Sequence, residues 1–341
     1  MRMCFRIMVI AGLVGFGATN SQAGEVLGRV RQTGEVRCGV TDANFPGFSI
    51  IVATGRWTGF WVDLCRGIAA ATIGNSDAVR FVPATESTRA AALRGNAIDV
   101  MSANTTWTLG REAGTGVRFV GPVLYDGQGF LAHAGGKAKD LKSFGRAKVC
   151  VREGTTTHRN LQDLTRGPYP DLTPVTFQSA KGLMEGLSLR KCDLITADRS
   201  ILAGARLASG MPKENFVLLP EIVSKEPLGL TVRDDDPQWF NIVQWSMLVM
   251  VAAEEKGITS RNVDSFANST DPEIRRLLGL EGELGAALGL DKKWATRIIR
   301  AVGNYGEVFD RNLGPNTPMG MDRGLNALWS NGGLMYAPPV R

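Results

Sequence analysis

The chain has 341 residues, of which 44% are hydrophobic and 21% charged, with a formal net charge of +6. No block of like charges and no basic run interleaved with aromatic residues occurs, so nucleic acid is not expected as a partner. The length favours two domains, and the apolar content is typical of a globular α/β protein.

Residues 1–23 have the pattern of a signal peptide for export. Arg2 and Arg6 give a positive start, residues 7–16 form a short apolar run, and a small-x-small sequence follows. The apolar run is too short to span a bilayer, and no later stretch reaches the required length. We therefore predict a soluble exported chain that begins at Gly24 and carries +4, which is +6 less the two arginines.

Helix and strand signals alternate in the first half of the mature chain. We expect strands at 36–40, 79–82 and 98–101 and helices at 25–32, 62–73 and 87–94. This order predicts a parallel, doubly wound sheet. A glycine-broken apolar segment follows over 117–132 and predicts a strand that crosses between two lobes.

The second half repeats the same order of elements. We expect strands at 147–151, 174–177 and 194–197, helices from about 159 and over 182–189, a second crossing at 226–232, and a long helix at 239–254. A mostly helical tail, including a helix over 294–305, begins at about 271. The predicted first lobe is 24–129 with 228–341, and the second is 130–227.

Four cysteines remain after export, namely Cys38, Cys65, Cys150 and Cys192. An even number in an exported protein indicates two disulfides, because the periplasm is oxidising. Of the three possible pairings, joining sequence neighbours gives Cys38–Cys65 and Cys150–Cys192, one in each half. No CxxC motif occurs and the chain has two histidines, so no metal site and no cofactor are expected.

The stretch from Asp99 to Arg111 places polar groups after a buried strand. Open α/β sheets bind ligands at the carboxyl ends of their strands. Arg111 follows Thr106 and the expected helix cap Thr108, and a guanidinium beside hydroxyl groups suits a carboxylate. Trp107 is a further candidate for the same pocket. The alternative is a surface arginine after a capped turn.

Two stretches in the second half are further candidates. Thr155 and Thr156 follow a strand and open a helix, where free N–H groups favour an anion; a simple helix cap is the alternative. Asp198 follows another strand end and suits an ammonium group, although it could instead bond its neighbour Arg199. Together, an anion site and a carboxylate match the two ends of an amino acid zwitterion.

The loop after the first strand carries Asp42 and Phe45. Phe45 is placed to form an apolar wall over a ligand, or else to plug the core, and Asp42 to meet a polar side chain. No GxSxG or HExxH motif occurs, so hydrolytic machinery is not evident.

The order of these stretches resembles the periplasmic solute-binding proteins of polar amino acid ABC uptake systems, known as bacterial solute-binding protein family 3. The resemblance covers nearly the whole mature chain. More narrowly, the chain resembles the general L-amino-acid-binding subgroup of this family. The segments that carry it are 59–64, 99–111, 125–129, 154–156, 192–199, 221–229 and 301–307.

The resemblance implies a type II periplasmic binding protein fold, with two α/β lobes, each an open sheet with flanking helices, joined by two crossing hinge strands. It implies an L-amino acid ligand, an ABC permease as partner, and a monomeric binding protein that is no enzyme. Arg111, Thr106 and Thr156 would bind the α-carboxylate, and Asp198 with the Asn104 carbonyl would bind the α-ammonium.

The alternative function is a periplasmic dehydratase of cyclohexadienyl acids on the same fold. Such an enzyme needs a general acid in the cleft, for which Asp198 or Glu153 would be the candidates.

Overall fold

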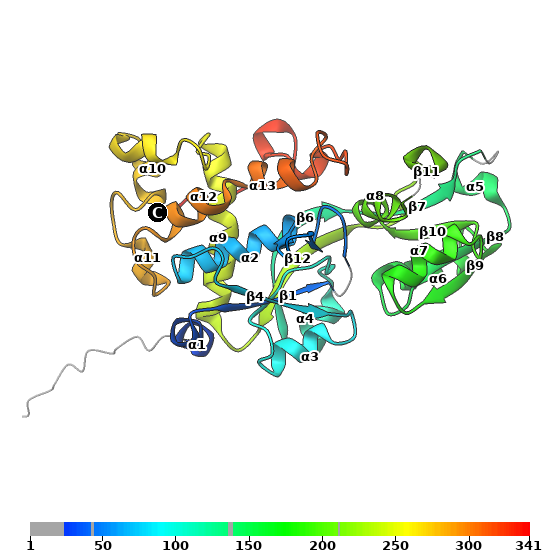
Figure 1. Cartoon of the computed structure of the whole chain (residues 1–341), viewed down its shortest axis with the longest axis horizontal. Coiled ribbons are helices and arrows are strands. Elements are labelled where there is room, and N and C mark those ends of the chain that lie inside the picture. Colours follow the sequence, from blue (N-terminus) through cyan, green and yellow to red (C-terminus); the bar gives the residue numbers. More distant parts are fainter. Residues whose placement is uncertain (1–23, 42–43, 136–138, 211) are drawn as a thin grey trace, which may run out of the picture.

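The computed structural model describes residues 24–41, 44–135, 139–210 and 212–341. The predicted signal peptide and Asp42 lie outside these ranges. Two lobes lie side by side, each built on a five-stranded sheet, and strands β6, β7 and β12 run between them (Figure 1). The fold is therefore the two-lobe α/β architecture that the sequence predicts.

The first sheet has the strand order β4–β1–β5–β12–β6. Its strands are β1 (Val36–Thr41), β4 (Val79–Ala84), β5 (Val100–Met101), β6 (Val117–Asp126) and β12 (Glu226–Arg233). β1 is parallel to β4 and β5, as expected, but β12 runs antiparallel to β5 and β6. The three strands expected to be parallel are so, and the sheet is mixed because the crossing strand β12 returns from the second lobe against the direction in which β6 leaves the first.

The second sheet has the order β11–β7–β10–β8–β9. Its strands are β7 (Gln128–His133), β8 (Ala147–Arg152), β9 (Leu172–Phe177), β10 (Leu194–Asp198) and β11 (Phe216–Leu218). β8 is parallel to β9 and β10, whereas β7 is antiparallel to β10 and β11. A separate ribbon joins β2 (Ile50–Ile51) to β3 (Trp57–Thr58).

Helices cover both sheets and form the tail. The first lobe carries α1 (Glu25–Thr33), α2 (Phe60–Thr72), α3 (Arg89–Arg94), α4 (Leu109–Thr115) and α9 (Pro237–Glu255). The second lobe carries α5 (Leu141–Phe144), α6 (Thr156–Arg166), α7 (Ala180–Ser188), α8 (Arg199–Ala208) and the 3-10 turn η1 (Lys213–Asn215). The tail carries η2 (Val263–Asn268), α10 (Pro272–Leu277), α11 (Leu284–Ala287), α12 (Trp294–Val302), α13 (Tyr305–Asn312), η3 (Gly324–Asn326) and η4 (Trp329–Asn331).

Local capping explains where several helices depart from prediction. α6 begins at Thr156 because the Thr155 hydroxyl caps it by accepting from the His158 N–H. The helix expected over 294–305 is two helices. Gly303 (φ 85°) ends α12, and Asn304 starts α13 with a capping box to Glu307. The tail is part of the first lobe's core, in which Tyr305 and Phe309 are fully buried.

Both predicted disulfides are confirmed, with Cys38 bonded to Cys65 and Cys150 to Cys192. The first joins β1 to α2, and the second joins β8 to the segment before β10. Each bridge therefore stays within one lobe. In the described part of the chain, no helix is both long and apolar enough to cross a membrane.

Candidate functional site

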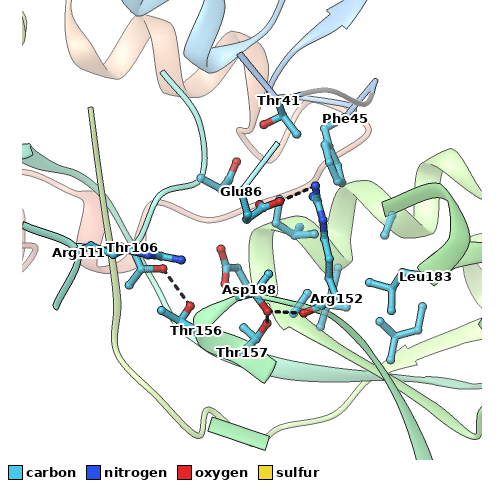
Figure 2. A pocket seen from close by; sticks show the side chains of 17 residues that line it. Thr41, Phe45, Glu86, Thr106, Arg111, Arg152, Thr156, Thr157, Leu183 and Asp198 are labelled. Carbon is cyan, nitrogen blue, oxygen red and sulfur yellow. Dashed lines mark hydrogen bonds and ion pairs between the residues drawn. The ribbon is translucent and has the colours of Figure 1, made fainter. Parts of the chain in front are cut away.

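A cavity that is partly open to solvent lies between the lobes at the carboxyl ends of the parallel strands (Figure 2). The first lobe lines it with Thr41, Phe45, Glu86, Asn104, Thr106 and Arg111. The second lobe lines it with Arg152, Thr155, Thr156, Thr157, Leu183, Ile195, Ala197, Asp198, Ile201, Leu202 and Ala205. Seven of the nine predicted ligand residues are thus brought together.

Arg111 is positioned by its own helix and by the loop before it. Its backbone N–H donates to the Thr108 hydroxyl (3.3 Å), the expected cap, and its Nη1 donates to the Thr106 carbonyl (2.9 Å). Burial lowers the pKa of Arg111, and so does nearby Arg89, whereas Glu226 opposes this shift. An arginine remains charged in proteins, so this half-buried guanidinium favours an anionic ligand.

Hydroxyl groups of the two lobes meet beside this arginine. The Thr106 and Thr156 hydroxyls share a hydrogen bond across the cleft at 3.2 Å. Thr156 Oγ1 also donates to Glu226 Oε2 (3.0 Å), and Glu226 is 1% exposed at the start of β12. The other oxygen of Glu226 accepts from Asn160 and Ser224. Glu226 therefore ties α6 of the second lobe to the crossing strand.

The first turn of α6 faces the same cavity. Thr155 Oγ1 bonds the Arg152 carbonyl and the Thr157 hydroxyl besides capping the helix, so its side chain is largely committed to local structure. The positive end of the helix dipole and the N–H groups of the first turn favour an anion here. The helix cap is therefore confirmed, and the anion site at the same helix start stays a prediction.

Asp198 is buried at the end of β10, where α8 begins. It makes no cap bond to the described residues of α8; Asp126 instead accepts from the Ser200 N–H (3.2 Å). Burial raises the pKa of Asp198 well above 3.8, as do Asp126 and Glu226, while Arg111 opposes this. A cation placed beside Asp198 would relieve this cost of burying a carboxylate.

Asn104 and Phe45 lie on the first-lobe side of the cavity. Asn104 Oδ1 accepts from the Trp61 indole (2.7 Å), while its Nδ2 is buried without a hydrogen-bond partner among the described residues. The Asn104 carbonyl accepts a long bond from Arg89 (3.4 Å). Phe45 is 7% exposed and belongs both to the cavity wall and to the core, so the two readings of this residue are not exclusive.

Trp107 is not among the described residues that line the cavity. Its ring stacks on Phe119 at 5.9 Å, and its indole donates to Glu112 (2.7 Å). Both partners of Trp107, Phe119 and Glu112, belong to the first lobe. They hold the indole ring against that lobe, and the expectation that Trp107 lines the pocket is therefore wrong. Asp42 lies outside the described residues.

Several residues at or near the cavity were missed by reasoning from the sequence. Arg152 ends β8, and its guanidinium reaches Glu86 of the first lobe at 2.5 Å. Asp126 and Glu226 face each other in the β6–β12 register, beneath Asp198. Arg152 could have been predicted as a site residue from its position at the end of a strand, as Asp198 was. For Asp126 and Glu226, no local sequence pattern distinguishes a carboxylate near the site from a carboxylate exposed to solvent.

Two α/β lobes joined by crossing strands, with a polar cavity between them, define the type II periplasmic binding protein fold. Residues 36–261 match the family described as bacterial extracellular solute-binding proteins, family 3, and the chain belongs to this family.

The similarity to individual relatives extends over the whole chain. The chain is 42% identical to the general L-amino acid-binding periplasmic protein AapJ of Rhizobium johnstonii, covering 97% of each. It is 43% identical to the glutamate/glutamine/aspartate/asparagine-binding protein BztA of Rhodobacter capsulatus, covering 99% of this chain and 98% of that one. A periplasmic binding protein from Brucella ovis with glutathione bound is 41% identical, with a TM-score of 0.90 over 92% of this chain and 99% of that one.

Proposed function

We propose that this protein captures an L-amino acid as its zwitterion between the two lobes and delivers it to an ABC permease. The observation that carries the proposal is the pairing in one cavity of a half-buried guanidinium, Arg111, with a buried carboxylate, Asp198, from opposite lobes. Thr106, Thr156 and the start of α6 would assist Arg111 with the α-carboxylate. Asp198 would hold the α-ammonium, with the Asn104 carbonyl as a second acceptor.

The relatives support the same class of ligand. AapJ and BztA are named for amino acid binding, and the glutathione of the Brucella structure carries an α-amino acid group at its γ-glutamyl end. Contacts from both lobes would favour the closed arrangement, so that binding shifts a hinge equilibrium about Gly127 and the start of β12. The closed protein, acting as a monomer, would then dock on the permease.

The dehydratase alternative has less support. Glu153, one of its two candidate acids, is exposed and accepts from the Gln178 amide, and it is not among the described residues that line the cavity. Asp198 remains, but an ammonium partner accounts for its burial beside Arg111 without requiring any turnover.

Calorimetric titration of unfolded, stripped and refolded protein against all twenty L-amino acids tests the proposal. Stripping removes any ligand retained through purification. We expect saturable binding of at least one amino acid, and no binding of the matching amine that lacks the carboxylate. Failure of every amino acid to bind would contradict the function.

We also propose export to the periplasm with cleavage between Ala23 and Gly24, on the strength of the signal-like pattern. N-terminal sequencing of the exported protein tests this, and a start that is displaced by more than a few residues would contradict it.

A further inference from the structure

An ion pair crosses the cleft between residues that the zwitterion site does not use. Arg152 Nη2 of the second lobe lies 2.5 Å from Glu86 Oε2 of the first, and their side chains are 10% and 19% exposed. Both residues line the cavity. The pair is therefore largely removed from water and in position to contact a ligand.

Arg152 lies where a ligand side chain would extend. Figure 2 shows Arg111 and Arg152 on opposite sides of Asp198, with Arg152 extending from the second lobe toward Phe45 and pairing with Glu86. A ligand held by its carboxylate at Arg111 and by its ammonium at Asp198 has the rest of the cavity on the Arg152 side. The side chain must then pass Arg152 before it reaches the apolar wall near Leu183.

Glu86 has a second cationic partner within its own lobe. Arg89 Nη2 lies 2.5 Å from Glu86 Oε1. Arg89 is 7% exposed and is held by the Thr105 hydroxyl and the Asn104 carbonyl. If Arg152 turned to a ligand, Glu86 would keep the Arg89 partner, so no buried charge would be stranded.

The charges at this end select among ligands. A second carboxylate can take a share of the Arg152 guanidinium, whose five donors allow it to serve two acceptors. An ammonium or guanidinium side chain would instead be repelled by Arg152, and the carboxylate of Glu86 beside it is already paired with Arg152 and Arg89. A neutral side chain can accept a hydrogen bond from Arg152 but forms no ion pair with it.

We propose that Arg152 is a specificity-determining residue and that the site prefers an α-amino acid with a second carboxylate on its side chain. Glutamate and aspartate are the simplest members of this class. Arg152 is shared between Glu86 and the ligand's second carboxylate. This inference rests on the proposed function and refines its ligand class.

The test compares L-glutamate with L-glutamine, which has nearly the same shape but no second charge. The stripped wild-type protein is expected to bind glutamate more tightly than glutamine. Arg152→Gln is expected to weaken glutamate binding by about tenfold to a hundredfold and to change glutamine binding by less than about threefold, because the ion pair with the ligand side chain is lost only with glutamate and the new amide can still donate to glutamine. Arg159→Gln is the matched control, since Arg159 is exposed on α6, and it should bind both ligands as the wild type does.

The outcomes separate this inference from the proposed function. If Arg152→Gln weakened both ligands equally, Arg152 would serve only lobe closure and the inference would be overturned. Tighter binding of glutamine than glutamate by the wild type would also overturn it, and this measurement needs no variant to fold. Binding of neither these two nor any other amino acid would instead refute the proposed function itself.

Discussion

Gly204 in α8 faces the carbonyl oxygen of Pro46 across the lobe boundary, and a Cβ atom at position 204 would lie 3.1 Å from that oxygen. The same Cβ would lie 3.7 Å from the Met319 side chain, which the tail contributes. α8 begins directly after Asp198. The close approach at Gly204 therefore helps to set how near Asp198 comes to the first lobe.

We predict that Gly204→Leu weakens the binding of every amino acid by roughly tenfold or more. The added side chain must displace Pro46 or Met319, and overpacking of this kind typically costs about 1–3 kcal/mol. Helix formation itself should not suffer, because leucine favours helices more than glycine does. Calorimetry would give the affinity, and X-ray scattering with ligand should show a more open shape. Ala208→Leu, on an exposed position of the same helix, serves as the control; unchanged binding by Gly204→Leu would contradict the prediction.

Arg111→Ala should weaken amino acid binding by about thirtyfold or more. Truncating one member of a buried charge pair costs about 2–5 kcal/mol, because the partner charge stays desolvated. Here the ligand carboxylate would be left with hydroxyl and helix N–H donors alone. Titration calorimetry measures the loss, with circular dichroism to check that the variant is folded. A folded variant with wild-type affinity would show that the carboxylate binds elsewhere.

Asp198→Asn should weaken α-amino acids to a similar degree but should barely affect a matched carboxylic acid that lacks the ammonium. The substitution keeps the size of the side chain and removes its charge, so the comparison isolates the ammonium contact. A dehydratase that used Asp198 as its acid would behave differently, keeping its affinity for substrate and losing turnover. Intact amino acid affinity in this variant would therefore favour an assay with prephenate-like acids.

Amino acid affinity should fall as the pH is lowered from 8 to 5. Burial raises the pKa of Asp126 to about 6, and it raises the pKa of Asp198 well above 3.8. A ligand ammonium favours ionised Asp198 and must expel its proton, so the affinity loss can approach about tenfold per pH unit for one coupled proton. Calorimetry in buffers with different heats of ionisation should detect this release, and Asp198→Asn should reduce it. Binding without proton release across this range would count against the linkage.

The sign for stability is opposite in the ligand-free protein. Raised pKa values mean that the folded chain holds these protons more tightly than the unfolded chain. The contribution of Asp126 to folding stability is therefore fully present below about pH 4 and is lost as the pH rises through about 6, and that of Asp198 changes in the same direction.

Removing the second-lobe disulfide by Cys150→Ser with Cys192→Ser should lower the free energy of unfolding by about 4 kcal/mol. The bridge closes a loop with a sequence separation of 42, and the chain-entropy model gives this value. The bridge between Cys38 and Cys65, with a separation of 27, should contribute slightly less. Urea unfolding measures both, and ligand affinity should change little because the described cavity lining includes none of the four cysteines. Equal stability of variant and wild type would contradict the prediction.

Local sequence signals located much of the site. The Thr108 cap placed Arg111 after a strand, and the Thr155 cap placed Thr156 at a helix start. These predictions succeeded because a cap depends on residues within a few positions of one another. The disulfide pairing also followed from the sequence, since each pair belongs to neighbouring elements of one unit.

Only the tertiary structure decided which groups meet across the cleft. Glu86 and Arg152 are 66 positions apart in the sequence, and no local pattern around either residue indicates that they form an ion pair. Glu226 reaches Thr156 only because β12 returns antiparallel beside β6, a pairing that the sequence did not predict. Trp107 packs on Phe119 because an apolar ring in a polar loop is buried against an apolar surface of the folded lobe, which the sequence does not locate. The sequence determined the chemistry at each strand end, whereas the packing of the two lobes decided which of these ends face one another.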